Sequence, residues 1–97
     1  MALPVPRVAL SAAQEVMVRR HYRYWTEFGD FDNETSEGYW MYEHYRSVLP
    51  TRYRYLADQL MNLYGKSNRT QDTLDTLRAI IGLAGPEIEW DSYLRGF

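Results

Sequence analysis

Hydrophobic residues recur along most of this chain every three or four positions, which is the spacing of amphipathic α-helices. Segments near 11–28, 35–49, 51–64 and 70–84 show this spacing, and no segment alternates strictly as a half-buried strand would. The pattern predicts an all-α fold, a small four-helix bundle. In chain order, the predicted buried faces are Leu10, Ala13, Met17, His21, Tyr24 and Phe28; Met41, Tyr42, Tyr45, Val48 and Leu49; Tyr53, Leu56, Ala57, Leu60, Met61, Leu63 and Tyr64; and Leu74, Leu77, Ile80, Ile81 and Ala84.

Residues with known positional preferences mark the ends of these helices. Ser11 can cap the first helix, and Gln14 three positions later completes a capping box. Pro50 ends or bends the second helix, and Thr51 after it can cap the third. Gly85, followed by proline, is typical of a helix end. The residues typical of helix ends therefore occur where the hydrophobic periodicity begins and stops.

The two ends of the chain differ from the bundle. Residues 1–10 contain Pro4 and Pro6, which disfavour regular pairing and predict an extended arm. The tail keeps helical spacing and predicts a short fifth turn. The chain is thus expected to be an arm, 1–10, followed by a single domain, 11–97, with both ends packed on the bundle or on a neighbouring subunit. The tail residues that carry the spacing are Ile88, Trp90, Tyr93, Leu94 and Phe97.

Composition narrows the class of protein. The chain has 97 residues, of which 45% are hydrophobic and 25% charged, as is typical of one folded domain. It has no cysteine, which excludes disulfides and thiol chemistry. No stretch reaches the ~20 apolar residues that span a membrane. We expect a cytoplasmic protein without membrane contact, or a protein of the host cytoplasm or virion if a virus encodes it.

Charge changes sign in blocks along the chain, although the net charge is only −2. Residues 1–28 and 51–70 have an excess of basic side chains, and residues 29–50 and 71–97 have an excess of acidic ones. A dedicated nucleic-acid-binding protein normally has a clear basic excess. The blocks instead favour contacts with one another or with a partner surface of mixed charge.

The sequence contains no motif that predicts catalysis, a cofactor or a metal site. His21 and His44 have no ligand or carboxylate at helical spacing, so a structural role is favoured for both. The acidic segment 29–38 lacks the terminal glutamate of a calcium loop. Glycines occur singly and are interpreted as helix caps rather than as phosphate loops. We therefore expect no enzymatic activity, cofactor, metal or small-molecule substrate.

A helix-turn-helix nucleic-acid-binding regulator is the alternative interpretation, with segments 51–64 and 70–84 as the two helices. Against it, Asp72 and Asp75 lie on the outer side of the second helix, where a carboxylate would face phosphate unfavourably. The local basic residues that would contact nucleic acid are Arg52, Arg54, Lys66 and Arg69.

The aromatic residues that fall off the predicted core faces carry the strongest functional signal. The chain has nine Tyr, three Trp and ten Arg against a single lysine, and these three residue types anchor protein interfaces. Trp40 and Tyr55 lie on the polar sides of their helices, which favours contact with a partner. For Tyr22 and Trp25, packing inside the bundle is favoured over an interface, although both remain candidates. The predicted partner surface comprises Trp40, Tyr55, Arg20, Arg23, Tyr22 and Trp25.

These patterns together predict a non-enzymatic protein–protein interaction module. Such a protein would act as an adaptor, an assembly subunit or an inhibitor by occupying a surface. We therefore expect it to bind a protein partner, to associate with itself, or both. Compact cysteine-free chains without catalytic motifs are common among phage and viral proteins, so such an origin fits this class. Nucleic acid is the less favoured partner.

Overall fold

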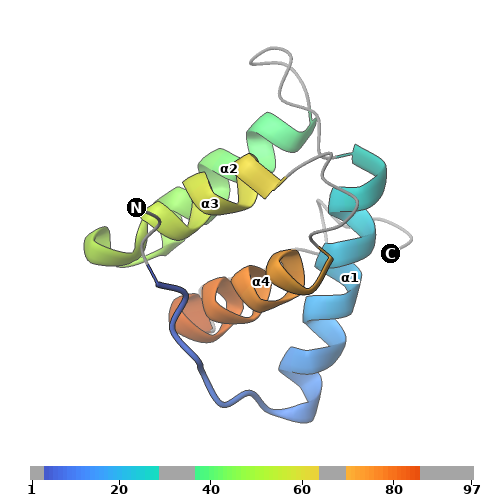
Figure 1. Cartoon of the computed structure of the whole chain (residues 1–97), viewed down its shortest axis with the longest axis vertical. Helices are drawn as coiled ribbons and strands as arrows, with labels where there is room; N and C mark the ends of the chain where they lie inside the picture. Colours follow the sequence, from blue (N-terminus) through green and yellow to red (C-terminus); the bar gives the residue numbers. More distant parts are fainter. Residues whose placement is uncertain (1–3, 29–36, 64–69, 86–97) are drawn as a thin grey trace.

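The computed structural model describes residues 4–28, 37–63 and 70–85, and the regular structure in these ranges is entirely helical. The elements are α1 (Ala12–Phe28), α2 (Glu37–Val48), a 3-10 turn η1 (Thr51–Tyr53), α3 (Tyr55–Leu63) and α4 (Thr70–Ala84). In Figure 1, α2 and α3 lie side by side, with α4 beneath them and α1 along one side. Helices α1 and α3 pack most extensively on α4, and α2 packs on α3 more than on α1. The all-α prediction is confirmed.

The start of α1 and the end of α4 have the predicted cap geometry. The Gln14 backbone N–H donates to Ser11 Oγ at 3.1 Å, and the Ser11 N–H donates to Gln14 Oε1 at 2.9 Å. Two amide groups that have no partner within the helix are thereby satisfied. After the last residue of α4, Gly85 has a positive φ of 61°, a conformation that glycine adopts without strain.

The prediction that Thr51 caps the third helix is wrong. Pro50 occupies the cap position of η1, no side chain caps this turn, and α3 begins only at Tyr55. The Tyr53 N–H donates to the Pro50 carbonyl at 2.8 Å, and the Arg54 N–H donates to the Thr51 carbonyl at 3.3 Å. These short-range bonds form a tight turn because proline fixes an extended entry into the segment.

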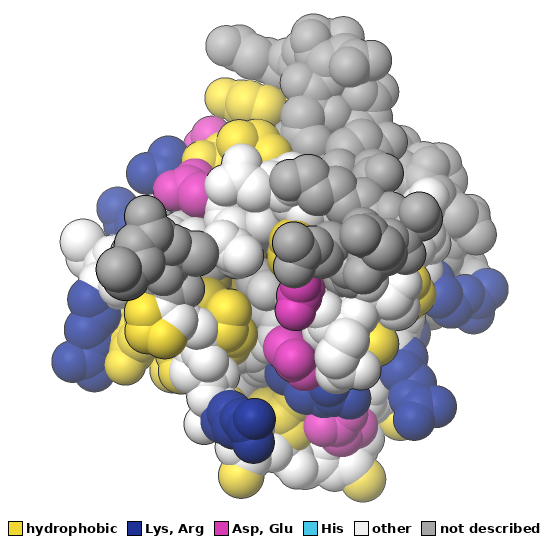
Figure 2. Space-filling model, in the orientation of Figure 1, with side chains coloured by type: hydrophobic (Ala, Val, Ile, Leu, Met, Phe, Trp, Pro, Cys, Tyr) yellow, Lys and Arg dark blue, Asp and Glu magenta, His cyan; other side chains and the backbone are white. Residues whose placement is uncertain are grey.

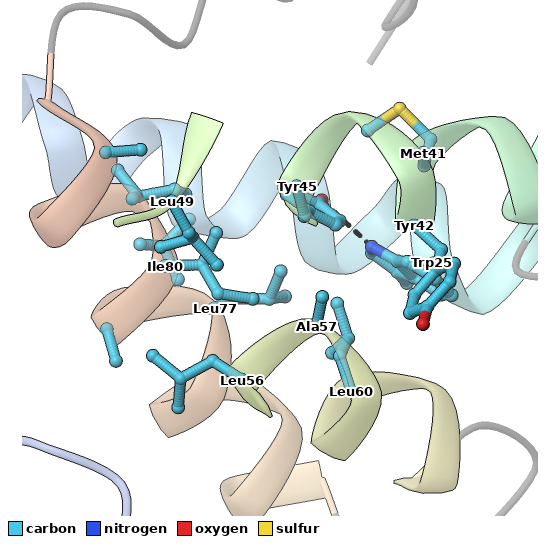
Figure 3. Packing of buried hydrophobic residues seen from close by; sticks show 14 of the residues in the cluster. Trp25, Met41, Tyr42, Tyr45, Leu49, Leu56, Ala57, Leu60, Leu77 and Ile80 are labelled. Carbon is cyan, nitrogen blue, oxygen red and sulfur yellow. Dashed lines mark hydrogen bonds between the residues drawn. The ribbon is translucent and has the colours of Figure 1, made fainter. Parts of the chain in front are cut away.

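The core lies where α4 meets α1 and α3, and α2 closes it from the side. Figure 3 shows Leu56 and Leu60 of α3 and Leu77 of α4 among the side chains of this buried cluster. The observed burial differs from the predicted buried faces at two places. Ala13 is exposed, because the first turn of α1 carries the cap and does not reach the core. Thr76 and Ala79 of α4 are fully buried, because two helices cover α4 on different sides.

The N-terminal arm packs on the bundle, as predicted. Val5 and Leu10 contact the core cluster. A Cβ atom at Gly82 would lie 2.4 Å from Cγ1 of Val8, so the arm touches the backbone of α4 there. Gly82 is within α4 rather than at its end, so the interpretation of every glycine as a cap is wrong for this residue. Leu3 of the arm, residues 29–36 of the acidic segment, Tyr64 of the predicted third helix and the tail 88–97 lie outside the described residues.

Candidate interaction surface

A buried polar cluster joins α1 to α2 in the core. The Trp25 indole N–H donates to the Tyr45 hydroxyl at 2.9 Å, and the same hydroxyl lies 2.7 Å from His21 Nδ1. The Trp25 and Tyr45 rings stack with centroids 5.9 Å apart (Figure 3). All three side chains are buried, so these bonds replace bonds to water that folding removes.

The bonding pattern fixes one proton position in this cluster. The indole can only donate, so the Tyr45 oxygen accepts from it. Which of Tyr45 and His21 Nδ1 donates to the other depends on the tautomer of the imidazole. Burial, with smaller contributions from the charges of Arg20 and His44, lowers the pKa of His21 to about 3. His21 is therefore neutral at physiological pH and has no exposed surface through which to act on a substrate.

Trp25 and Tyr22 mainly link the helices of the bundle. Trp25 is only 4% exposed, so it belongs to the core and not to the predicted partner surface. Tyr22 is half-buried, and its hydroxyl makes a long hydrogen bond of 3.5 Å to Thr70 Oγ1 at the start of α4. Both α4 and α2 pack against the wide apolar arc of α1. This agrees with the interpretation that Tyr22 and Trp25 pack inside the bundle.

Trp40 differs from the other described aromatic residues because its side chain lies largely outside the bundle. It is 56% exposed, whereas its sequence neighbour Met41 and the next core residue on α2, Tyr45, are fully buried. Glu43 and Ser47 are exposed as well, at the spacings of three and seven residues that place them on the same face as Trp40. An indole therefore stands among polar side chains on a helix whose core face is complete without it.

The helix that carries Trp40 is held firmly by its neighbours. The Tyr42 hydroxyl donates to Asp58 of α3, and the Arg46 guanidinium lies over the Tyr42 ring at 5.8 Å. Burial and the hydrogen bond to Asp58 raise the pKa of Tyr42 to about 12, so the phenol stays protonated and can donate. Trp40 thus projects from a helix that is fixed on its opposite side.

Basic side chains and one exposed valine follow the outer side of α1. Val16 is 59% exposed, Arg19 and Arg23 are exposed, and Arg20 is half-buried. Arg20 and Arg23 therefore reach solvent as the sequence predicted, but from a different helix than Trp40.

Arg78 of α4 bonds inward toward α1. Its Nε donates to both carboxylate oxygens of Glu15 at 3.3 Å, and its Nη1 donates to Asp75, also at 3.3 Å. Arg78 is the only arginine in the sequence of α4. In the alternative interpretation, α4 would contact nucleic acid. The guanidinium of its one arginine is bonded to carboxylates of the same chain, and the side chain of Asp75 is exposed.

The predicted basic block is only partly described. Arg52 and Arg54 are exposed, and the Arg52 guanidinium lies 4.9 Å from the centre of the Tyr53 ring, but Lys66 and Arg69 fall outside the described residues. Figure 2 shows acidic and basic side chains interleaved among the described residues of one face, without a broad patch of one sign.

Tyr55 has an intramolecular role that its sequence position did not reveal. Its hydroxyl donates to the carbonyl of Pro4 at 2.9 Å, a contact between residues that are 51 positions apart. The ring is half-buried and tilted against Tyr53, with centroids 6.4 Å apart. Tyr55 thus holds the N-terminal arm, and no sequence signal relates the two positions.

Within the described ranges, no group of three or more His, Asp or Glu side chains is placed to bind a metal ion. In the same ranges, no helix combines the length and the apolar character needed to cross a membrane. No protein-family model matches the chain, and comparisons with curated proteins and with solved structures likewise found no match.

Proposed function

We propose that this chain is a non-enzymatic protein–protein interaction module whose principal anchor is Trp40. The observation that carries the proposal is the 56% exposure of this indole on a helix with a complete core face. Leaving a large aromatic side chain in water forfeits the free energy of its burial. A partner pocket would recover that free energy while Glu43 and Ser47 stay solvated at the rim.

The arginines of α1 would form a second contact region of this surface. The protein would then act as an adaptor, an assembly subunit or an inhibitor. Arg20 and Arg23 present positive charge, and arginine is enriched at interface anchors because its planar fork forms paired hydrogen bonds. Tyr55 contributes less directly, since its hydroxyl is used to hold Pro4. The absence of exposed surface on His21 supports a binding role rather than acid–base chemistry.

The test is the substitution Trp40→Ala, with Val16→Ala as the matched control. Val16 is exposed to a similar degree, at 59%, but lies on α1 and outside the Trp40 face. A tagged chain captures its partner from source cells, and the affinity for the identified partner is measured with each variant. Self-association is measured in parallel by size-exclusion chromatography with light scattering.

We expect Trp40→Ala to leave the melting temperature nearly unchanged and to weaken association by roughly 2 kcal/mol, about 30-fold in Kd. Val16→Ala should change the affinity little. A folded Trp40→Ala variant that binds as tightly as the original chain would remove this residue from the interface. A large fall in melting temperature would show instead that the indole supports the fold.

A further inference from the structure

Trp40 and Glu43 lie close together on the exposed side of α2, and both reach solvent. Trp40 is 56% exposed, and Glu43, one helical turn later, is exposed as well. Side chains three positions apart on a helix have Cβ atoms ~5–6 Å apart. An indole and a carboxylate therefore share one small area of surface, on a helix at the edge of the bundle (Figure 1).

Among the described residues, no cation is paired with the carboxylate of Glu43. Arg46, the one arginine of α2, follows three positions later, a spacing that permits an ion pair. Its guanidinium lies instead over the ring of Tyr42, 5.8 Å from the ring centre. His44 is neutral at physiological pH, because burial lowers its pKa below the usual 6.5. The negative charge of Glu43 is thus available to a partner.

The indole of Trp40 is available in the same way. A tryptophan ring attracts a cation over its face more strongly than a tyrosine or phenylalanine ring does. Arg46 nevertheless lies over Tyr42 and not over the indole on the same helix. Within the described ranges, no aromatic ring and no basic side chain of the chain stacks on Trp40. The surface therefore combines an open indole with an unpaired carboxylate, which are the two groups that attract a cation.

We infer that the partner of this surface presents a basic side chain, best an arginine, which stacks on the Trp40 indole and pairs with the Glu43 carboxylate. The inference rests on the proposed function of Trp40 as an anchor and states the chemistry of the partner. A guanidinium makes both contacts at once, because its flat face stacks on an aromatic ring while the N–H groups at its edge donate to a carboxylate. An apolar partner would cover the indole but would bring no charge to Glu43, and an acidic partner would be repelled by it.

A library of random peptides tests this chemistry before the natural partner is known. Peptides are selected on the immobilised full chain, and those that no longer bind Trp40→Ala are retained as ligands of this surface. The affinity of each retained peptide is then measured for the original chain, for Glu43→Gln and for Asp75→Asn. Glu43→Gln removes the charge and keeps the size of the side chain. Asp75→Asn is the matched control, because it changes the net charge equally at an exposed position of α4.

We expect the retained peptides to share a basic residue, most often arginine. Glu43→Gln should weaken their binding about fivefold, as the loss of an ion pair at the edge of an interface does. Asp75→Asn should bind them as the original chain does. Replacing the basic residue of a peptide by glutamine should weaken binding to the original chain more than binding to Glu43→Gln, because the two charges act on each other.

Two results would overturn the inference and leave Trp40 in place as an anchor. One is a set of retained peptides without a shared basic residue, and the other is equal affinity of these peptides for the original chain and for Glu43→Gln. If Trp40→Ala unfolds, or if every selected peptide binds it as tightly as the original chain, the anchor itself is refuted and this inference with it. Failure of the partner chemistry is therefore distinguishable from failure of the proposed function.

Discussion

Acidification should destabilise this protein through one buried side chain, His21. The imidazole has no exposed surface, and burial lowers its pKa from 6.5 to about 3 in the folded protein. The unfolded chain therefore binds a proton at pH values where the folded protein does not. The contribution of neutral His21 to the free energy of unfolding is fully present above pH 6.5. It is lost as the pH falls through that value toward 3, because protonation favours the unfolded state.

The magnitude follows from the separation of the two pKa values. Each pH unit within this window removes about 1.4 kcal/mol, so the loss is about 2 kcal/mol at pH 5 and approaches roughly 5 kcal/mol near pH 3. Domains of this size are typically stable by about 5–15 kcal/mol. The contribution of His21 at pH 5 is thus a substantial part of the free energy of unfolding.

The assay compares urea unfolding of the original chain with that of His21→Asn. The asparagine amide, which has both a donor and an acceptor, can take the place of Nδ1 as hydrogen-bond partner of the Tyr45 hydroxyl, but it binds no proton in this range. Both proteins retain His44, so its contribution cancels. Far-UV circular dichroism gives the free energy of unfolding from about pH 7.5 to about pH 5, above the range where most carboxylates titrate.

We expect the original chain to lose about 2 kcal/mol more than His21→Asn over this range. The smaller side chain leaves a cavity that lowers the stability of the variant at every pH, so only the difference in slope is informative. Equal pH dependence of the two proteins would refute the reasoning. It would show that the imidazole is protonated as readily in the folded protein as in the unfolded chain.

Two further substitutions test contacts between distant segments. Gly82→Ala should raise helix propensity by about 1 kcal/mol, but its methyl group would lie 2.4 Å from Val8 Cγ1, so we expect no gain in stability and faster tryptic cleavage within the arm. A stabilised protein with an equally protected arm would contradict the close contact. Tyr45→Phe removes the hydroxyl shared by His21 and Trp25 and should lower the free energy of unfolding by about 2–5 kcal/mol in urea titrations. A loss below about 1 kcal/mol would show that these two groups find other partners.

The ends of the helices were predictable where they depend on neighbouring residues. The capping box of Ser11 and Gln14 and the glycine at position 85 act within one or two helical turns, so their effect can be inferred from spacing alone. Thr51 shows the limit of such local rules. Its hydroxyl could cap a helix, but the backbone hydrogen bonds of η1 to the Pro50 and Thr51 carbonyls form a 3-10 turn there, and α3 begins only at Tyr55.

The roles of the aromatic side chains were predictable only in part. The exposure of Trp40 followed from its place on the polar side of α2, because α2 needs one buried face. Trp25 lies on a broad apolar arc, and periodicity does not state how many neighbours cover such an arc. Its burial was decided by α2, which brings the Tyr45 hydroxyl within hydrogen-bonding distance of the indole.

The sequence by itself determined the fold class, the helix periodicities and the exposure of Trp40, since these depend on interactions between residues a few positions apart. The tertiary structure decided the contacts between residues far apart in the chain. Glu15 meets Arg78, Tyr55 holds Pro4, and Val8 rests on Gly82. Such contacts depend on how whole helices are oriented, and the spacing of residues within one helix carries no information about the neighbour that it will meet.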